Sequence, residues 1–469
     1  MIKKIAVSLC AYVVAFPAYA QENIRGIYSD QIDEIFSQYN ETTPGCAVAV
    51  DQQGALIHLG GYGMADLEQD VPIRPDTVFY AGSVSKQFVG MSAMLLDHDG
   101  RIDLDEPVRT YLPALPDYAD RITVRQTLHH TSGLRDFFWL FYLAGKPANY
   151  VITEPAIMEI LAQQEGLNFE PGTQYAYSNS AYFLISQIVN AVYGDNLDAF
   201  AQERIFEPLD MADSRFQHDH RRLVKRKAHG YAPRSGGDYL LSDSTLDVVG
   251  SGGMYSTVVD LIKWDRNFYD NKLGGGASLI DEMQQSAVLN SGEETEYGVA
   301  LKLTPYRGIS RVHHNGSLAG YRSTLQRFPD EKLTIALLCN SSKAKPSAYA
   351  TAIADIVLAE KIGPKDETAS KRDDASASYV LSASEQLSFV GDYYSHEVDN
   401  TITIVRDEKV LRIRGIIGSD DKLYPVANDH LRHYGRDFDL LFIRNSDGAI
   451  ESFTVKSARA SGIVFEKQP

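Results

Sequence analysis

Several features common in membrane proteins and hydrolases are missing from this 469-residue chain. No run of 18 or more apolar residues occurs, so no segment is long enough to cross a membrane as a helix. No Gly-x-Ser-x-Gly motif occurs, which argues against an α/β-hydrolase. The 12 histidines include no His-Glu-x-x-His. The possible two-ligand pair His218-Asp219-His220 is followed by two arginines, and the adjacent pairs His129-His130 and His313-His314 would point to opposite sides in a strand. We therefore expect no catalytic metal and no other cofactor.

Cysteine is also scarce. Of the three cysteines, only Cys46 and Cys339 lie beyond the N-terminal segment described next. An oxidising compartment would allow them to form a disulfide. The alternative is two buried apolar thiols, because each cysteine lies in a strand-like apolar run. The sequence favours two separate thiols and does not exclude the disulfide.

The first 20 residues have the pattern of a secretory signal peptide. Lys3 and Lys4 form a basic start, residues 5–16 an apolar middle, and Ala18-Tyr19-Ala20 a small-residue cleavage site. We therefore expect a secreted, periplasmic protein. The net charge of −17 argues against nucleic acid and anionic membrane surfaces as partners.

The apolar pattern predicts a mixed α/β (α+β) fold for residues 21–360. Strand-like runs at both ends enclose a mainly helical block, so both ends should meet in one antiparallel sheet flanked by helices, with a helical lobe beside it. The expected strands are 46–50, 55–59, 77–80, 298–303, 311–314, 322–328 and 333–339. The expected helices are 25–40, 87–98, 123–128, 154–164, 181–192, 197–205, 257–269, 278–287 and 346–361. Loops at 135–150 and 215–249 are expected to determine the substrate specificity.

A second, smaller unit is expected at the C-terminus. Residues 361–378 are charged and rich in small side chains, with Ile362 as the one large aliphatic residue, which is typical of a linker. Residues 379–469 carry short strand-like runs separated by turns, which predicts a small antiparallel β-barrel or sandwich. These strands are 400–405, 410–413, 440–443, 452–455 and 462–465.

Ser83 and Lys86 are the first candidates for catalysis. They follow the strand-like stretch Thr77–Tyr80 and open a helical pattern. A serine hydroxyl needs a base beside it, and residues i and i+3 of a helix lie on one face, so Lys86 would lie next to Ser83. Ser-x-x-Lys also occurs by chance at 342–345 and 419–422. A helix-capping serine with a solvated lysine is the simpler interpretation of the pair taken alone.

Tyr177-Ser178-Asn179 is the second candidate. A tyrosine beside an ammonium group can have a lowered pKa and act as a base or proton relay. An asparagine offers both a donor and an acceptor, which suits a substrate amide. Taken alone, the segment is more simply a turn into a helix, with Asn179 as the cap and Tyr177 as packing.

His314-Asn315-Gly316-Ser317 is the third candidate and lies in a strand and turn context. Gly316 would let a substrate approach the backbone closely. The N–H of Ser317 would then be an oxyanion donor. The simpler interpretation of His314 alone is a half-buried strand histidine.

Together the three elements resemble the serine β-lactamase and penicillin-recognising hydrolase superfamily. The likeness is to its class C β-lactamase-related branch, which includes D-Ala-D-Ala carboxypeptidase B and the D-aminopeptidases, and it covers about residues 25–360. Further landmarks similar to that branch lie at 98–107, 128–134 (Leu-His-His-Thr-Ser-Gly-Leu), 169–172 (Phe-Glu-Pro-Gly) and 250–254 (Gly-Ser-Gly-Gly-Met) with Asp260. The C-terminal unit is similar, more loosely, to lipocalin-like barrels appended to some members.

The resemblance implies a β-lactamase/transpeptidase-like fold and a two-step acyl transfer. Ser83 would be the acylated nucleophile, with Lys86 and Tyr177 sharing the proton transfers. Asn179 would orient Lys86 and the substrate amide. The amides of Ser83 and Ser317 would form the oxyanion hole.

One position departs from the family pattern. Class C β-lactamases and many penicillin-binding proteins carry lysine where this chain has His314. A histidine is mostly neutral at pH 7 unless its pKa is raised, so it supplies no permanent cation for a substrate carboxylate. We therefore expect weak β-lactamase activity, and either a substrate that needs no carboxylate or a site that works best when mildly acidic.

Three alternatives remain at this stage. The expected function is hydrolysis of a D-amino-acid peptide or a peptidoglycan-derived peptide, and a β-lactamase or carboxylesterase of the same family is the nearest rival. A sensor that binds penicillin or peptidoglycan without turnover is the non-enzyme rival. The set Ser83, Lys86, Tyr177 and Asn179 argues against the sensor, because binding alone does not need all four. The sequence does not fix the oligomeric state.

Overall fold

The computed structural model describes residues 24–147, 150–364, 379–416 and 422–469. The expected signal peptide and most of the expected linker lie outside these ranges. No helix in the described part of the chain is both long enough and apolar enough to traverse a bilayer.

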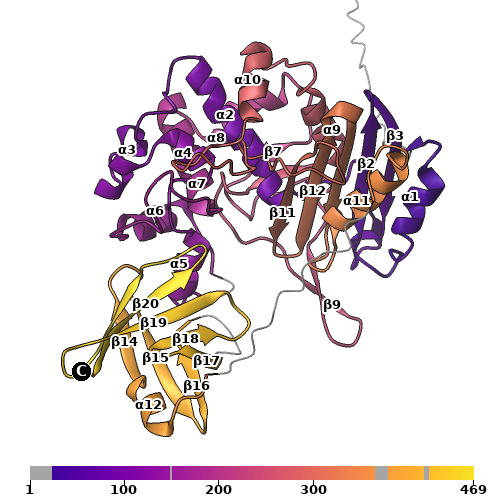
Figure 1. The fold of residues 1–469 in the computed structure, drawn as a ribbon. Coiled ribbons are helices and arrows are strands. Elements are labelled where there is room, and N and C mark those ends of the chain that lie inside the picture. The colour runs from indigo at the N-terminus through magenta and orange to yellow at the C-terminus, as the bar shows by residue number, and fades with distance from the viewer. Residues whose placement is uncertain (1–23, 148–149, 365–378, 417–421) are drawn as a thin grey trace, which may run out of the picture.

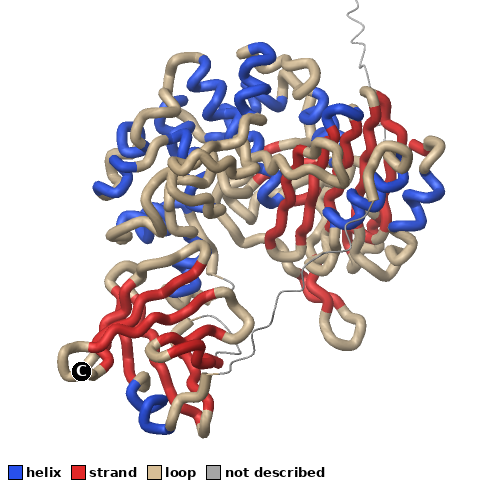
Figure 2. The backbone as a smooth tube through the Cα atoms, viewed as in Figure 1, coloured by secondary structure: helices blue, strands red, loops and turns tan. Residues whose placement is uncertain are grey.

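The larger part of the chain is built on a six-stranded antiparallel sheet (Figures 1 and 2). The strand order is β1-β3-β2-β13-β12-β11. The strands are β1 (Ile24–Arg25), β2 (Cys46–Gln52), β3 (Ala55–Tyr62), β11 (Val312–Leu318), β12 (Tyr321–Phe328) and β13 (Leu333–Cys339). Because β2 pairs with β13, strands from both ends of this part of the chain meet in one sheet, as expected.

Cys46 and Cys339 form a disulfide between β2 and β13. The two residues lie directly opposite each other in the paired strands. The prediction of two separate thiols is therefore wrong. Their 293-residue separation along the chain carries no information on register, and the register is what brings the two sulfur atoms together.

Helices cover both faces of the sheet because side chains alternate along its central strands. Val48 and Val50 contribute to one apolar cluster and Ala47 and Ala49 to another. The first cluster is covered by α1 (Ser29–Ile35) and α11 (Pro346–Val357), which lie side by side in Figure 1. The opposite face packs against α9 (Val258–Arg266).

A helical lobe lies beside the sheet (Figure 1). Its α-helices are α2 (Lys86–His98), α3 (Val108–Tyr111), α4 (Val124–Leu128), α5 (Phe137–Leu143), α6 (Glu154–Ala162), α7 (Asn179–Tyr193), α8 (Leu197–Ala201) and α10 (Gly276–Met283). Short 3₁₀ and π turns lie at η1 (Gly82–Ser85), η2 (Asp117–Arg121), η3 (Gln202–Phe206) and, beyond the lobe, η4 (Pro329–Glu331). The centre of the lobe is α2, which packs on α7 and is buried over Lys86–Leu96.

Small sheets tie the lobe to the main sheet. A three-stranded sheet has the order β6 (Phe79–Tyr80), β10 (Met254–Ser256) and β7 (Arg215–Phe216). Two hairpins pair β4 (Met64–Asp66) with β5 (Val71–Pro72) and β8 (Tyr231–Pro233) with β9 (Tyr239–Leu241).

Two local predictions are wrong. Residues 298–303 form no strand, and only isolated bridges join Lys302 to Tyr297 and His313. Residues 135–150 are not simply a loop, because α5 occupies Phe137–Leu143. Its Asp136 cap accepts a hydrogen bond from Phe138 N, and an aromatic run follows that packs in the core.

The C-terminal unit is a closed eight-stranded antiparallel barrel. A short helix, α12 (Ala383–Ser388), precedes it. Its strands are β14 (Gly391–Ser395), β15 (Asn400–Asp407), β16 (Val410–Arg414), β17 (Lys422–Ala427), β18 (His430–His433), β19 (Phe438–Arg444), β20 (Ile450–Ser457) and β21 (Val464–Lys467). The pairing of β14 with β21 closes the barrel, so of the two expected architectures the barrel is the one observed.

The barrel docks on the helical lobe around α5 (Figure 1). The side chain of Arg135, 4% exposed, forms an ion pair with that of Glu397, 7% exposed. The ring of Phe438 packs edge-on against Trp139 and Tyr142 of α5. Asn400 donates a hydrogen bond of 2.7 Å to the Leu143 carbonyl. These contacts bury charged and aromatic groups, which fixes the barrel against the lobe.

Candidate active site

Ser83 lies where the chain passes from β6 into α2. The prediction placed it in the first turn of an α-helix, whereas it lies in the 3₁₀ turn η1 and α2 begins at Lys86. Ser83 and Lys86 are nevertheless neighbours, as predicted, because they are three residues apart along a backbone that continues from a 3₁₀ turn into an α-helix. The Nζ atom of Lys86 lies 3.2 Å from the Oγ atom of Ser83.

Lys86 is fully buried. Besides Ser83, its Nζ atom contacts two oxygen acceptors, Asn179 Oδ1 at 2.9 Å and the Ser251 carbonyl. Burial lowers the pKa of Lys86 well below its usual value, and the charge of Asp136 opposes this shift. A neutral lysine amine has two N–H bonds and one lone pair. Since two acceptors take the N–H bonds, the lone pair is left for the Ser83 hydroxyl.

Asn179 is held by a carboxylate behind it. The backbone N–H and the side-chain Nδ2 of Asn179 both donate to Asp136, at 2.8 and 2.7 Å. The amide is thus oriented with Oδ1 toward Lys86, as the resemblance implied. Asn179 itself is the first residue of α7, and the cap that the sequence assigned to it belongs to Ser178.

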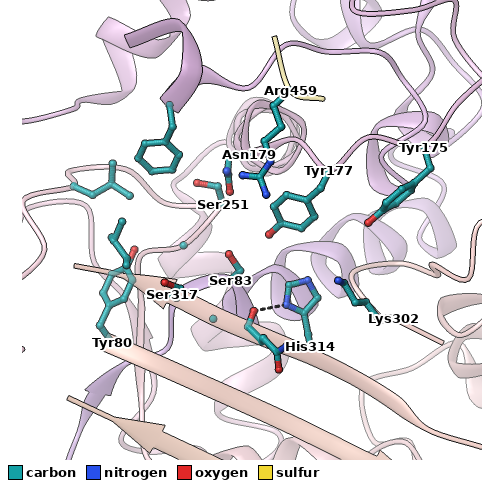
Figure 3. A pocket seen from close by; sticks show the side chains of 17 residues that line it. Tyr80, Ser83, Tyr175, Tyr177, Asn179, Ser251, Lys302, His314, Ser317 and Arg459 are labelled. Carbon is teal, nitrogen blue, oxygen red and sulfur yellow. Dashed lines mark hydrogen bonds between the residues drawn. The ribbon is translucent and has the colours of Figure 1, made fainter. Parts of the chain in front are cut away.

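Tyr177 lies over Lys86, with Nζ 5.0 Å from the ring centroid. Figure 3 shows its hydroxyl directed toward Ser83. That hydroxyl is buried and interacts with the Ser83 side chain without forming a well-aligned hydrogen bond. Burial raises the pKa of Tyr177 instead of lowering it, so the expected low pKa is wrong. The same burial disfavours an ammonium charge on Lys86 that would stabilise a phenolate.

His314 projects from β11 into the same site (Figure 3). Its Nδ1 atom lies 2.8 Å from the Asn315 carbonyl, and its Nε2 atom lies 3.2 Å from the Tyr297 hydroxyl. Because a carbonyl only accepts, Nδ1 carries the proton and Nε2 accepts from Tyr297. Burial is the main cause that lowers the pKa of His314, to about 3. A histidine with this pKa is neutral at mildly acidic pH, which argues against activation of the site there.

Gly316 and Gly82 bring β11 against η1. A Cβ atom on Gly316 would lie 2.2 Å from the Ala81 carbonyl oxygen and 3.0 Å from Ser83 N, and one on Gly82 would lie 2.7 Å from Ser317 N. The space at Gly316 therefore serves a close approach within the chain. Gly316 also lines the pocket described next, so the predicted approach of a substrate to its backbone stays a prediction. It places the amides of Ser83 and Ser317 on neighbouring segments.

All three predicted elements line one pocket of about 620 Å³ (Figure 3). Ser83, Tyr177, Asn179, His314, Gly316 and Ser317 line it, and Lys86 lies beneath Ser83. Tyr80, Phe138, Leu246 and Leu318 form apolar parts of its wall. The pocket also contains Lys302 and, from the barrel, Arg459.

Sequence reasoning missed four residues of this site. Asp136 holds Asn179, the Ser251 carbonyl holds Lys86, and Lys302 and Arg459 line the pocket. The Gly-Ser-Gly-Gly landmark at 250–253 marked the Ser251 segment without indicating its contact. Asp136 directly precedes an aromatic run, which signals a helix cap and nothing catalytic.

The structure also brings part of the rejected metal motif together. Ligand atoms of Asp219, His220 and Asp247 lie within 4.8 Å of one another. The Asp219 carboxylate already binds the Arg221 guanidinium through two hydrogen bonds of 2.8 Å, and His220 Nδ1 lies 2.8 Å from Asp247 Oδ1. These contacts already occupy oxygen and nitrogen atoms that would bind a metal, and His218 is not part of the cluster.

The chain belongs to the Beta-lactamase family, whose profile matches residues 32–359. The match covers all of the predicted site residues. It does not include the barrel, which carries Arg459. The antiparallel sheet flanked by helices is the fold of that family, and the barrel is an addition to it.

Curated relatives are similar over the same part of the chain. A D-aminopeptidase of Gluconobacter oxydans is 28% identical over 312 residues, which are 66% of this chain and 58% of that protein. Penicillin-binding protein 4* of Bacillus subtilis is 29% identical over 335 residues, 67% of this chain and 71% of that protein. The chain spans less than two thirds of the length of the D-aminopeptidase. The family and these relatives support a serine hydrolase.

Solved structures show the same fold. The octameric penicillin-binding protein homologue from Pyrococcus abyssi superposes with a TM-score of 0.62 at 22% identity, over 93% of this chain and 98% of that chain. A D-amino acid amidase from Ochrobactrum anthropi has a TM-score of 0.58 at 24% identity, over 71% of this chain and 99% of that chain.

Proposed function

We propose that this chain is a secreted serine hydrolase that cleaves an amide or ester bond through an acyl intermediate on Ser83. The single observation that carries the proposal is the surroundings of Lys86 Nζ, which is buried between two oxygen acceptors and the Ser83 hydroxyl. Its substrate is a D-amino-acid-containing peptide, including one derived from peptidoglycan. The names of the relatives, a D-aminopeptidase and a penicillin-binding protein, support this class.

The first step is acylation. The neutral amine of Lys86 takes the Ser83 proton while Oγ attacks the substrate carbonyl carbon, and the charge that develops on the carbonyl oxygen is stabilised by the amides of Ser83 and Ser317. The departing amine or alcohol needs a proton. Tyr177 stays protonated because it is buried, and its hydroxyl is directed at Ser83, so it is the donor to the leaving group.

The second step is hydrolysis of the acyl-enzyme. Lys86 passes the proton it gained to Tyr177, and a water molecule that loses its proton to Lys86 attacks the acyl carbon. The tetrahedral intermediate then collapses with Ser83 Oγ as the leaving group, and Lys86 returns its proton to that oxygen. Asn179 keeps Lys86 in place through both steps, since its own amide is fixed by Asp136.

We expect poor turnover of β-lactams, because His314 is neutral and β11 therefore offers no permanent cation for their carboxylate.

We also propose how the chain is divided and where it is located. It comprises a signal peptide (1–20), a catalytic unit (21–360), a linker (361–378) and a barrel (379–469), and the mature protein is periplasmic.

The test is an intact-mass time course of the mature protein with a penicillin and, separately, with D-alanyl p-nitroanilide. We expect an acyl adduct that maps to Ser83 and Ser83-dependent release of nitroaniline. Ser83→Ala removes both. Ser92→Ala, a change at a buried serine of α2 that donates a hydrogen bond to the Phe88 carbonyl, keeps both. Hydrolysis that persists in Ser83→Ala would overturn the proposal, and binding without any adduct or turnover would favour the sensor.

A further inference from the structure

The barrel contributes a charged side chain to the cleft of the catalytic unit. Arg459 lies in the turn between β20 and β21, and it lines the same pocket as Ser83 (Figure 3). Its guanidinium carbon lies 5.2 Å from the centroid of the Tyr177 ring. A residue from the far end of the chain is thus placed directly over the proposed proton donor.

The turn that carries Arg459 is fixed on the catalytic unit through its backbone. The Arg459 carbonyl accepts hydrogen bonds from Asp136 N at 2.9 Å and from Asn168 Nδ2 at 3.2 Å. Two residues later, Ser461 N donates to Asn168 Oδ1 at 2.7 Å, and the Ser461 carbonyl accepts from Arg135 Nε at 3.0 Å. Because the backbone makes these contacts, the guanidinium is left available for a ligand.

The charges around the cleft are of one sign. Its lining includes the cations Lys302 and Arg459 and no aspartate or glutamate. Among the described residues, no ion pair involves Lys302 or Arg459. Asp136, the nearest buried carboxylate, has its oxygens occupied by Asn179 and Phe138 N–H groups. An anionic ligand finds complementary charge here, whereas a substrate ammonium group finds no carboxylate on the wall.

We propose that Arg459, assisted by Lys302, binds a free carboxylate of the substrate, so that the barrel makes the hydrolase selective for short peptides with an unblocked C-terminus. Arginine binds carboxylates through two parallel hydrogen bonds, which a neutral imidazole such as that of His314 cannot do. The inference rests on the proposed function, and it replaces the expectation of a substrate that needs no carboxylate.

The kinetic test compares N-acetyl-D-alanyl-D-alanine with its C-terminal carboxamide on the mature full-length protein. We expect the wild type to prefer the acid, and Arg459→Gln to lower the acid-to-amide ratio of kcat/KM by roughly 10- to 100-fold, the usual worth of a charged hydrogen bond. Arg459→Lys should retain part of the preference. Arg412→Gln is the matched control, since Arg412 pairs with Asp407 on the barrel and does not line the cleft.

An unchanged ratio in Arg459→Gln, with hydrolysis still dependent on Ser83, would overturn this inference and leave the hydrolase intact. A protein that cleaves neither peptide in a Ser83-dependent way would overturn the proposed function. In that event the same two peptides are titrated calorimetrically into the Ser83→Ala variant. Tighter binding of the acid that is lost in Ser83→Ala/Arg459→Gln supports the carboxylate site, and equal binding of acid and amide overturns it.

Discussion

Asp136 accepts two hydrogen bonds from Asn179, one from its backbone N–H at 2.8 Å and one from its side-chain Nδ2 at 2.7 Å. The carboxylate is fully buried, and it leaves the amide of Asn179 only one orientation, with Oδ1 against Lys86. Asp136 N also donates to the Arg459 carbonyl, so one residue joins the site to the barrel. We regard Asp136 as a positioning residue, because it contacts neither Ser83 nor the pocket.

The first prediction concerns Asp136→Asn. An asparagine carries donors where the carboxylate only accepts, so the Asn179 amide loses its fixed orientation, and we expect kcat/KM to fall by roughly 10- to 100-fold, the worth of one or two charged hydrogen bonds. The charge of Asp136 raises the pKa of Lys86 against burial. Its removal lowers that pKa further, so the acid limb of the pH profile moves to lower pH.

The control for this prediction is Asp260→Asn. Asp260 is another buried carboxylate, and it accepts hydrogen bonds from Asp213 N and Ser214 Oγ outside the site. We expect it to lower the thermal midpoint without moving the acid limb. If the acid limb of the pH profile has the same midpoint in Asp136→Asn as in the wild type, the Asp136 carboxylate does not influence the pKa of Lys86.

The second prediction concerns His314, whose pKa burial lowers to about 3. A histidine with that pKa gains its charge only below about pH 3, so it does not titrate in the working range. We therefore expect kcat/KM to fall on acidification only as Lys86, whose pKa burial lowers, becomes protonated. His314→Gln should reduce the rate and keep the midpoint of this limb. A rate that rises on acidification in the wild type and not in the variant would contradict the assignment.

The third prediction concerns the disulfide between Cys46 and Cys339. It closes a segment with a sequence separation of 293 residues and therefore restricts the unfolded chain strongly. Reduction should lower the free energy of unfolding by about 3–5 kcal/mol, with activity at 25 °C retained because β2 and β13 remain paired. The measurement is thermal unfolding with and without reductant. The Cys46→Ala/Cys339→Ala variant should melt at the lower temperature under both conditions.

The fourth prediction concerns the buried pair of Arg135 and Glu397 between lobe and barrel. Glu397→Gln leaves the Arg135 charge without its carboxylate in a buried interface, and such a loss destabilises proteins by about 3–5 kcal/mol. We expect the barrel of this variant to unfold in a transition of its own, at a lower urea concentration than in the wild type. Glu451→Gln, a change at an exposed position of β20, is the control and should leave the transition unchanged. Equal transitions in both variants would show that the pair does not hold the barrel.

Much of the fold follows from local pattern. The hairpin of β2 and β3 was predicted because a turn at residues 51–54 separates two apolar runs, and β13 because its seven residues are almost continuously apolar. Residues 298–303 show the limit of this reasoning. Most of them are buried, but Ala300 has a φ of 57°, which interrupts an extended strand and leaves Lys302 as a single bridge to β11. Burial alone does not make a strand.

The site was predictable to the extent that its residues are neighbours in sequence. Ser83 and Lys86 are three residues apart, so helical geometry alone joins them. The ionisation of Tyr177 was not predictable. The sequence places it near a lysine, and only the packing reveals that both groups are buried, which raises the pKa of the tyrosine and lowers that of the lysine.

The sequence by itself determined the kind of chemistry, because the residue types and spacings of Ser83, Lys86, Tyr177 and Asn179 leave few other uses for them together. The tertiary structure alone decided three things: the register that joins Cys46 to Cys339, the depth of burial that sets the charge of each group, and the arrival of Arg459 in the cleft. The physical reason is common to all three. Each depends on contacts between segments far apart along the chain, and no local periodicity encodes them.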